Sequence, residues 1–206
     1  MRFVSAVFLA GLLALSAQAQ TELYPGLQGD ALLSAIRSDY TPNQTLGYGP
    51  ARDVLWAYTD DADGALCGVY TGFCIQLTPG ADPSSDAFAK GINAEHNWPQ
   101  AFGASAEPAR GDMNNLFPSR IEANSDRANF PFAEIPDADT DRWLMGTQTQ
   151  TTIPTSSLGD WSELDQQNPT PGFSGRFEPR HDHKGNAARS AFYFATIYAS
   201  QVSAAG

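Results

Sequence analysis

The chain has 206 residues, a formal net charge of −11 and a hydrophobic fraction of 42%. This length fits one domain with a substantial core. The acidic balance by itself argues against a polyanionic partner such as nucleic acid. The charge distribution qualifies that argument, because basic side chains are concentrated in residues 176–189. These basic residues are Arg176, Arg180, Lys184 and Arg189.

The first residues are typical of an export signal. Arg2 precedes the apolar run FVSAVFLAGLLALSA, and Ala17-Gln18-Ala19 fits the small-x-small cleavage pattern. The run is short and adjoins the cleavage pattern, and no later stretch is apolar enough to span a membrane. We therefore expect residues 1–19 to be a signal peptide and residues 20–206 to form a single domain. The mature protein is expected to be periplasmic or secreted, monomeric and without a membrane partner.

Cys67 and Cys74 are the only cysteines in the sequence. An exported chain places them in an oxidising compartment, which favours a disulfide. Closing so short a loop stabilises by about 2–3 kcal/mol, so the bond is expected to act as a local staple. Metal binding by the pair is the alternative.

Two helices are expected before residue 60. Asp30 is placed to cap the first, and the second covers 51–58, with Pro50 in its first turn. Apolar residues recur at helical spacing in both, so each is expected to present one apolar face. These faces comprise Leu32, Leu33, Ala35 and Ile36 in the first helix, and Val54, Leu55 and Tyr58 in the second.

Residues 60–90 are expected to contain a hairpin and a loop. The DDADG sequence at 60–64 predicts a turn. Two β-rich runs follow, 66–70 and 73–77, and Thr71-Gly72 between them is typical of a hairpin turn. Residues 78–90 are rich in Pro, Ser and Asp, which predicts a loop.

Residues 92–130 predict a strand–loop–strand–helix unit. The strands are expected over 92–96 and 112–118. Ser119 and Glu122 form a capping-box pattern that predicts a helix start at Ser119.

The rest of the chain predicts an irregular stretch and a final helix. Residues 131–175 contain many prolines and polar residues, so they are expected to be a functional arm or an excursion with short strands. Residues 184–202 predict a helix whose buried face carries Ala187, Ala188, Ala191, Ala195, Tyr198 and Val202. The fold class expected is α+β, a mixed helical domain with a small β-hairpin-plus-helix core.

The pair Glu95-His96 and the nearby Asn124 bring together groups suited to phosphodiester hydrolysis. Histidine has the intrinsic pKa of a general base near neutral pH. Glutamate and asparagine oxygens can hold a hard cation such as Mg²⁺ while leaving most of its ligands to water and phosphate. Each residue type also has a structural alternative: a surface carboxylate, a satisfied core histidine or a solvated helix asparagine.

Three segments together resemble the bacterial endonuclease I family, whose ββα-metal site is also called a His-Me finger. They are NAEHNWPQAFG, GDMNNLFPSRIEANSDRANFPF and FEPRHDHKGNAARSAFYFATIY, in this order in the second half of the chain. The resemblance implies that His96 is the general base. It also implies that Glu95 and Asn124 bind one Mg²⁺, for which Mn²⁺ or Ca²⁺ are possible substitutes.

The reaction that the resemblance implies is hydrolysis of DNA, RNA or both, with the metal stabilising the 3′-oxygen leaving group and 5′-phosphate ends as products. Recognition is expected to use backbone phosphates, with little sequence specificity. Relatives carry a phosphate-binding arginine in a long insertion, whereas this chain has a short Ala/Gly-rich loop. The candidates here are Arg110, Arg127, Arg180 and Arg189, with Arg180 ranked first. Asp112 and Asn115 are expected to hold the hairpin by hydrogen bonds.

Two other functions remain open from the sequence. His96, His181 and His183 could form a three-histidine zinc site in a secreted hydrolase of another class. Alternatively, the protein could be a secreted, non-catalytic binding module that uses Trp98, Trp143 and Trp161 on loops.

Overall fold

The structure is a computed structural model that describes residues 22–59, 61–62, 64–168 and 171–205. The expected signal peptide, residues 1–19, lies outside the described residues. Helices and small antiparallel sheets alternate along the chain, so the predicted α+β class is confirmed. Within the described ranges, no helix combines the length and the apolar character needed to cross a membrane.

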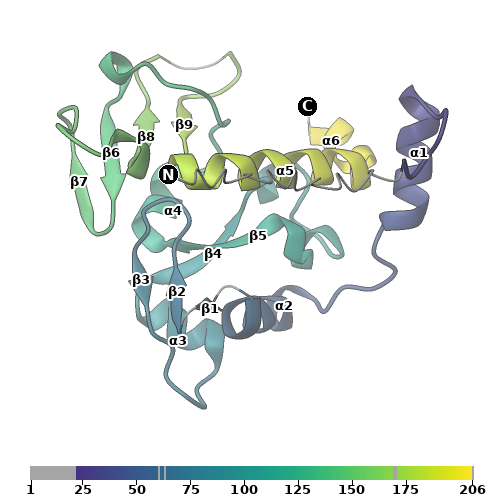
Figure 1. Ribbon diagram of the computed structural model, residues 1–206, viewed down its shortest axis with the longest axis horizontal. Helices are drawn as coiled ribbons and strands as arrows, with labels where there is room; N and C mark the ends of the chain where they lie inside the picture. The colour runs from purple at the N-terminus through teal and green to yellow at the C-terminus, as the bar shows by residue number, and fades with distance from the viewer. Residues whose placement is uncertain (1–21, 60, 63, 169–170, 206) are drawn as a thin grey trace, which may run out of the picture.

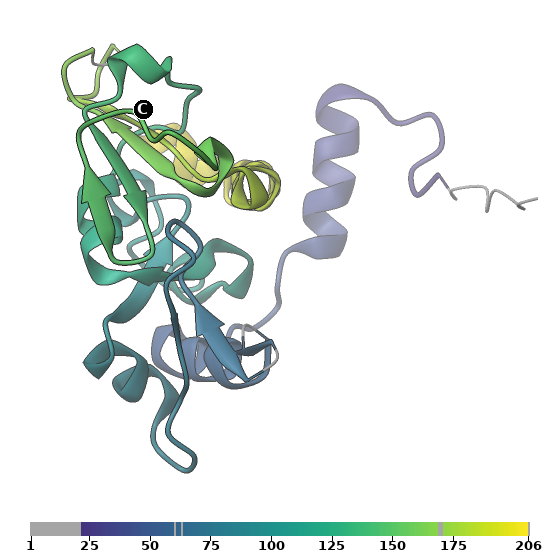
Figure 2. The same ribbon diagram turned by 60° about the vertical axis from the view of Figure 1, so that its left-hand side comes forward.

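Helix α1 spans Gly29–Tyr40 and lies at the edge of the molecule, joined to the rest by an extended segment (Figure 2). Its N-cap is Gln28, so the prediction that Asp30 caps the helix is wrong. Asp30 instead lies in the first turn, where a carboxylate interacts favourably with the helix dipole. None of the residues of α1 is buried, and it contacts α5 through Arg37, whose Nε donates to the carbonyl of Thr196 at 2.7 Å.

Helix α2 spans Tyr48–Val54 and continues as a π-helical turn over Leu55–Thr59. The wider turn changes the direction of the following side chains. Leu55 is buried as predicted, whereas Tyr58 is 85% exposed, so its prediction as a core residue is wrong.

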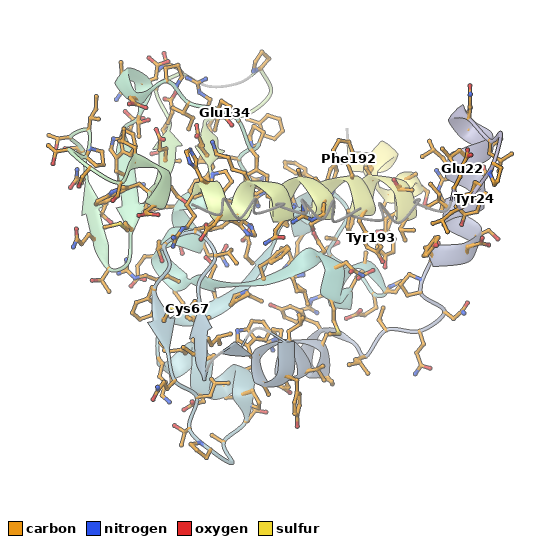
Figure 3. The ribbon with its side chains drawn as sticks, viewed as in Figure 1. Glu22, Tyr24, Cys67, Glu134, Phe192 and Tyr193 are labelled. Atoms are coloured by element: carbon orange, nitrogen blue, oxygen red, sulfur yellow. A yellow bond between two sulfur atoms is a disulfide. The ribbon has the colours of Figure 1, made fainter. Side chains whose placement is uncertain are left out.

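Strands β1 (Asp61–Ala62), β2 (Ala65–Cys67) and β3 (Cys74–Ile75) form an antiparallel sheet. The predicted hairpin is confirmed with shorter strands, and the predicted turn at 60–64 falls partly outside the described residues. Cys67 lies opposite Cys74 in the β2–β3 register, and the two form the predicted disulfide (Figure 3). The bond closes the base of the turn that carries Tyr70.

Helix α3 spans Pro83–Ala89, so the prediction of a loop over residues 78–90 is wrong. Asp82 caps the helix by accepting a hydrogen bond from the Ser85 amide at 2.8 Å, and Pro83 occupies the first helical position. Asp and Pro favour loops and helix starts alike, so the composition of residues 78–90 does not distinguish a loop from a helix. The Lys90–Asp86 ion pair at 2.7 Å supports the helix end.

Strand β4 spans Ile92–His96, as predicted, and pairs antiparallel with β5, Leu116–Arg120. The second strand begins later than the predicted 112–118. The reason is a 3₁₀ turn over Met113–Asn115, capped by Asp112, which accepts a hydrogen bond from the Asn114 amide at 2.9 Å.

Helix α4 spans Ile121–Arg127 and completes the predicted strand–strand–helix order. The predicted capping box is wrong, because Ser119 belongs to β5 and lies opposite Asn93. Its hydroxyl is buried and donates to the carbonyl of Arg120 at 3.3 Å. Strand β5 ends at Arg120 and α4 begins at Ile121, so Ser119 and Glu122 lie on either side of a direct strand-to-helix junction.

Residues 131–175 provide three strands of a four-stranded antiparallel sheet, in the order β7-β6-β8-β9. The alternative of short strands, instead of a structureless arm, is confirmed. Leu144 of β6, Leu164 of β8 and Phe177 of β9 pack into one core cluster with Tyr70. The strands span Arg142–Met145 (β6), Gln148–Gln150 (β7), Ser162–Asp165 (β8) and Arg176–Glu178 (β9).

Helix α5 spans His181–Ile197 and crosses the middle of the molecule in the view of Figure 1. Helix α6 follows at Ala199–Ala205. The buried stripe of α5 is His183, Ala187, Ser190, Phe194 and Ile197. The predicted face was partly wrong, because Ala188 and Ala195 are exposed. Alanine occurs on both faces of this helix, so the spacing of the alanines does not indicate which face is buried.

Short 3₁₀ turns connect these elements. They lie at Gln100–Phe102, Ala109–Gly111, Met113–Asn115, Asp137–Asp139 and Leu158–Asp160.

Candidate active site

The β4–β5 hairpin and α4 place Glu95, His96 and Asn124 around one cavity of about 280 Å³. Adjacent side chains of a strand point to opposite faces. Glu95 and His96 nevertheless both line this cavity, which lies where β4 ends. Only 2% of Glu95 and 5% of His96 are exposed. The other lining residues are Ala94, Pro99, Gln100, Ala101, Arg127, Ala128 and Asn129.

His96 is held in one tautomer. Its Nε2 lies 2.9 Å from the carbonyl oxygen of Arg110, which can only accept, so Nε2 carries the proton. Nδ1 then has the lone pair, and the Gln100 side-chain amide lies 3.2 Å from it. The imidazole also stacks on Tyr48, with 5.3 Å between ring centroids. Burial lowers the pKa of His96, so the neutral form that can accept a proton is favoured.

Glu95 is a buried carboxylate with two partners from other parts of the fold. Its Oε1 accepts a hydrogen bond from the Tyr70 hydroxyl at 2.7 Å and lies 3.1 Å from Nη1 of Arg127. Burial raises the pKa of Glu95, while Arg127 and Tyr70 act in the opposite direction. These two residues therefore favour the ionised carboxylate that a metal ligand requires.

Asn124 is oriented by its own amide nitrogen. Nδ2 donates to Oδ1 of Asn93 at 2.8 Å and to the carbonyl oxygen of Ala94 at 3.0 Å. Oδ1 of Asn124 is therefore the atom available to a cation. A carboxylate and an amide oxygen on one polar cavity fit the preference of Mg²⁺ for hard oxygen ligands, and the remaining space fits the waters that this ion retains.

The structure does not bring Arg180 to this cavity. Its Nε lies 2.9 Å from Asp182, and its Nη2 lies 3.7 Å from Asp160. The guanidinium also lies against Gly72, where a Cβ atom would clash with Nη1. A phosphate-binding role for Arg180 therefore stays a prediction.

The other candidate arginines occupy three different environments. Arg127 lines the cavity, but it is buried and donates to the carbonyls of His96 and Asn97 as well as contacting Glu95. The Arg110 guanidinium lies over the Tyr48 ring, 4.5 Å from its centroid. Arg189 is on α5 and donates to Asn186.

Asp112 and Asn115 hold the hairpin through hydrogen bonds, as predicted. Oδ2 of Asp112 accepts from the hydroxyls of Tyr193 and Tyr198, at 2.6 and 2.7 Å. The Asn115 side chain bonds both the amide and the carbonyl of Trp98. The Asp112 contacts therefore tie the loop before β5 to α5 and its C-terminal end, and the Asn115 contacts tie it to the residues after β4.

The positions of Tyr48, Tyr70 and Gln100 relative to the site were not predicted from the sequence. Gln100 follows His96 by four residues, but nothing in that spacing indicates a contact with the imidazole. Tyr48 and Tyr70 reach the site from other elements, and no local pattern marks such a contact.

A comparison with protein-family models gives a match to the one described as Endonuclease I, over residues 30–206. The chain belongs to the endonuclease I family. It is therefore a nuclease, an enzyme whose substrate is nucleic acid, and the family is in general metal-dependent. The proposed alternative of a non-catalytic binding module is wrong. A search of curated proteins gave no match.

The tryptophans considered for that binding module are largely core residues of the endonuclease. Trp143 is in β6 and fully buried, and Trp161 is 6% exposed. Trp98 stacks on Phe194, with 5.3 Å between ring centroids.

The three-histidine zinc site is also wrong. Within the described residues, no group of three or more His, Cys, Asp or Glu side chains is placed to hold a metal ion. His183 packs against Phe117 and Tyr70 at centroid distances of 4.9 and 5.6 Å. His181 is exposed on the first turn of α5. His183 is therefore a core residue of the endonuclease.

Replacing His183 with leucine is expected to improve the acid stability of this endonuclease. Burial lowers the pKa of His183 to about 4, and neither ring nitrogen has a hydrogen-bond partner in the described part of the chain. Between about pH 6.5 and pH 4 the unfolded chain binds a proton that the folded chain does not, so wild-type stability falls as the pH falls. The variant lacks this loss, which amounts to about 2 kcal/mol at pH 5.

Urea unfolding at pH 8 and pH 5 measures this effect. The stability difference between His183→Leu and wild type is expected to grow in favour of the variant at pH 5. His181→Leu is the matched control, because His181 is exposed and on the same helix. An equal difference at both pH values for His183→Leu would show that His183 takes up a proton in the folded protein.

Proposed function

We propose that this endonuclease is exported and metal-dependent, and that it hydrolyses DNA, RNA or both with little sequence specificity, leaving 5′-phosphate ends. The observation that carries the proposal is the single cavity lined by His96, Glu95 and Asn124. One wall offers a neutral imidazole with a defined lone pair, and another offers two oxygen ligands.

In this proposal His96 acts as the general base. Nδ1 takes a proton from the attacking water, and the carbonyl of Arg110 stabilises the resulting imidazolium through the Nε2–H hydrogen bond. Gln100 contacts Nδ1 from the position that the water has to occupy. The Gln100 side chain therefore gives way to the water, or orients it, when substrate binds.

Glu95 and Asn124 are the proposed ligands of one Mg²⁺, with Mn²⁺ or Ca²⁺ as substitutes. When bound, the metal supplies Lewis-acid stabilisation of negative charge at the 3′-oxygen leaving group. Tyr70 and Arg127 hold the Glu95 carboxylate in place, so that it does not have to be ordered during binding. Preorganisation of this kind lowers the cost of metal binding.

Substrate recognition is proposed to run through backbone phosphates, so binding weakens as salt rises. Arg180 remains the proposed phosphate contact. Since Arg180 does not line the cavity, we assign it to a nucleic-acid phosphate beside the cleaved one. On binding, its ion pairs with Asp160 and Asp182 would be replaced by an ion pair with that phosphate. Residues 1–19 are the proposed signal peptide, and residues 20–206 are proposed to act as one monomeric domain in the periplasm or outside the cell.

Incubation of the purified protein with plasmid DNA or RNA, with Mg²⁺ or with a chelator, tests the proposed function. Cleavage of at least one substrate is expected with Mg²⁺, and the chelator is expected to abolish it. Fragment ends should carry 5′-phosphates at many different sequences. Cleavage that persists in excess chelator would contradict the metal requirement, and a strict sequence motif at the cut sites would contradict backbone recognition.

A further inference from the structure

A second cavity, of about 460 Å³, adjoins the catalytic cavity. The two cavities share Pro99, Arg127 and Asn129 in their linings. Its volume falls within the range of about 300–1,000 Å³ that is typical of small-molecule pockets. A group bound there would lie directly beside the cleavage site.

Five of the twelve residues that line this second cavity are aromatic. They are Trp98, Phe102, Phe130, Phe132 and Phe173. Phe102 and Phe173 meet edge to face, with 5.6 Å between centroids and an interplanar angle of 90°. Trp98 is fixed by its stacking on Phe194 and by the bond from its Nε1 to the carbonyl of Phe102. The cavity therefore offers ordered aromatic surfaces to a flat ligand.

Three polar side chains interrupt this apolar wall: Asn97, Arg127 and Asn129. Of these, Asn97 and Arg127 are each only 2% exposed. Asn97 donates from Nδ2 to the carbonyl of Ala187, but within the described residues its Oδ1 has no hydrogen-bond partner. Nε of Arg127 likewise has no partner in the part of the chain that the structure describes. Both unpaired atoms are buried within the wall of the cavity, where polar groups are nearly always paired.

We propose that this second cavity binds one nucleobase of the substrate, next to the cleaved phosphate, and that it makes single-stranded nucleic acid the preferred substrate. The inference rests on the proposed function. A nucleobase has two flat faces, which stack on aromatic rings such as those that line this cavity. The continuity of the two cavities favours a base that is attached to the scissile strand.

A preference for single strands follows from where the base has to go. In a duplex each base is stacked and paired, and it must leave the helix before it can enter a protein cavity. In a single strand the base is already accessible. Aromatic stacking tolerates every base, because each has a flat π-face, so this site is compatible with low sequence specificity.

The decisive test compares cleavage of two single-stranded oligonucleotides by wild-type enzyme with Mg²⁺. One carries a base at every position, and the other has a single abasic residue. Cleavage at the phosphates that flank the abasic residue is expected to be about tenfold slower than at the same phosphates in the complete strand. Equal rates at these phosphates overturn the base site and leave the proposed nuclease function intact. If neither strand, nor plasmid DNA, nor RNA is cut, the proposed function fails and this inference fails with it.

Variants of Phe173 provide a second test, because Phe173 is only partly buried and lies in the loop before β9. Phe173→Ala and Phe173→Leu are both expected to lower kcat/KM on single strands about tenfold, since leucine keeps apolar bulk but has no π-face. Phe88→Ala is the matched control, because Phe88 is 61% exposed on α3. Wild-type kcat/KM in Phe173→Leu would show that the cavity needs only apolar volume, and would overturn base stacking.

A binding measurement separates this site from the chemical step. An oligonucleotide that contains 2-aminopurine is titrated with the His96→Ala variant in the presence of Mg²⁺. Stacking in the cavity is expected to quench the 2-aminopurine fluorescence, and combining His96→Ala with Phe173→Ala is expected to remove the quenching. Binding without any change in fluorescence overturns the proposal.

Discussion

The His96→Ala variant is expected to cleave nucleic acid about 10²–10⁴-fold more slowly than wild type, with the loss in kcat. The Nε2 bond to the carbonyl of Arg110 fixes the tautomer, and burial lowers the pKa of His96. Both features prepare Nδ1 to accept a proton. No other histidine lines this cavity, so no second imidazole is placed to replace it.

Initial rates on one substrate at saturating Mg²⁺ measure this loss. His181→Ala is the control, because His181 is exposed on α5 and outside the cavity. Its rate is expected to equal that of wild type. Thermal unfolding of both variants checks that His96→Ala retains the fold without the imidazole that stacks on Tyr48. A folded His96→Ala variant with wild-type kcat would exclude His96 as the base.

The Arg127→Met variant is expected to unfold more easily than wild type by about 3–5 kcal/mol. The substitution leaves the Glu95 carboxylate buried without its cation, which lies 3.1 Å away in the wild-type protein. It also removes the bond to the Asn97 carbonyl and the cation–π contact with Phe132, whose ring centroid is 4.6 Å from the guanidinium carbon.

Urea denaturation measures this loss of stability. Arg142→Met is a matched control, because Arg142 pairs with Asp126 at 2.8 Å but is about one-third exposed. Partly exposed ion pairs contribute about 0–1 kcal/mol, so the control is expected to remain close to wild type. Adding Glu95→Gln to Arg127→Met should recover part of the loss, because the amide is neutral. Equal losses of stability for Arg127→Met and Arg142→Met would show that the buried ion pair contributes no more than the partly exposed one.

The sequence predicted the first strand of the β4–β5 hairpin well because the information for it is local. Residues 92–96 form β4 as expected, and Glu95, His96 and Asn124 line one cavity. Helix starts were predicted less well. Ser, Asp and Pro favour caps, turns and strand ends alike. For this reason residues 78–90 are predicted as a loop although they contain α3, and Ser119 is predicted as a helix cap although it is the last but one residue of β5.

Contacts between distant segments account for the rest. Tyr70 reaches Glu95 from the β2–β3 hairpin, and Tyr48 stacks on His96 from α2. No local pattern records such a contact. Arg180 is ranked first as the phosphate contact because it lies in a basic segment. In the structure its charge is paired with Asp160 and Asp182, so the sequence does not indicate which partner it has, and its role stays a prediction.

The hydrogen bonds that hold the β4–β5 hairpin also constrain the order in which the enzyme is assembled. Asn97, next to His96, donates to Ala187, a residue 90 positions later in the chain. Asp112, which closes the other end of the loop between the strands, is bound by Tyr198, 86 positions later. During synthesis, the hairpin therefore emerges well before the helix that fixes it. The enzyme is expected to gain activity only after its last helix has been made and has packed, so an incomplete chain still on the ribosome would not degrade nearby RNA.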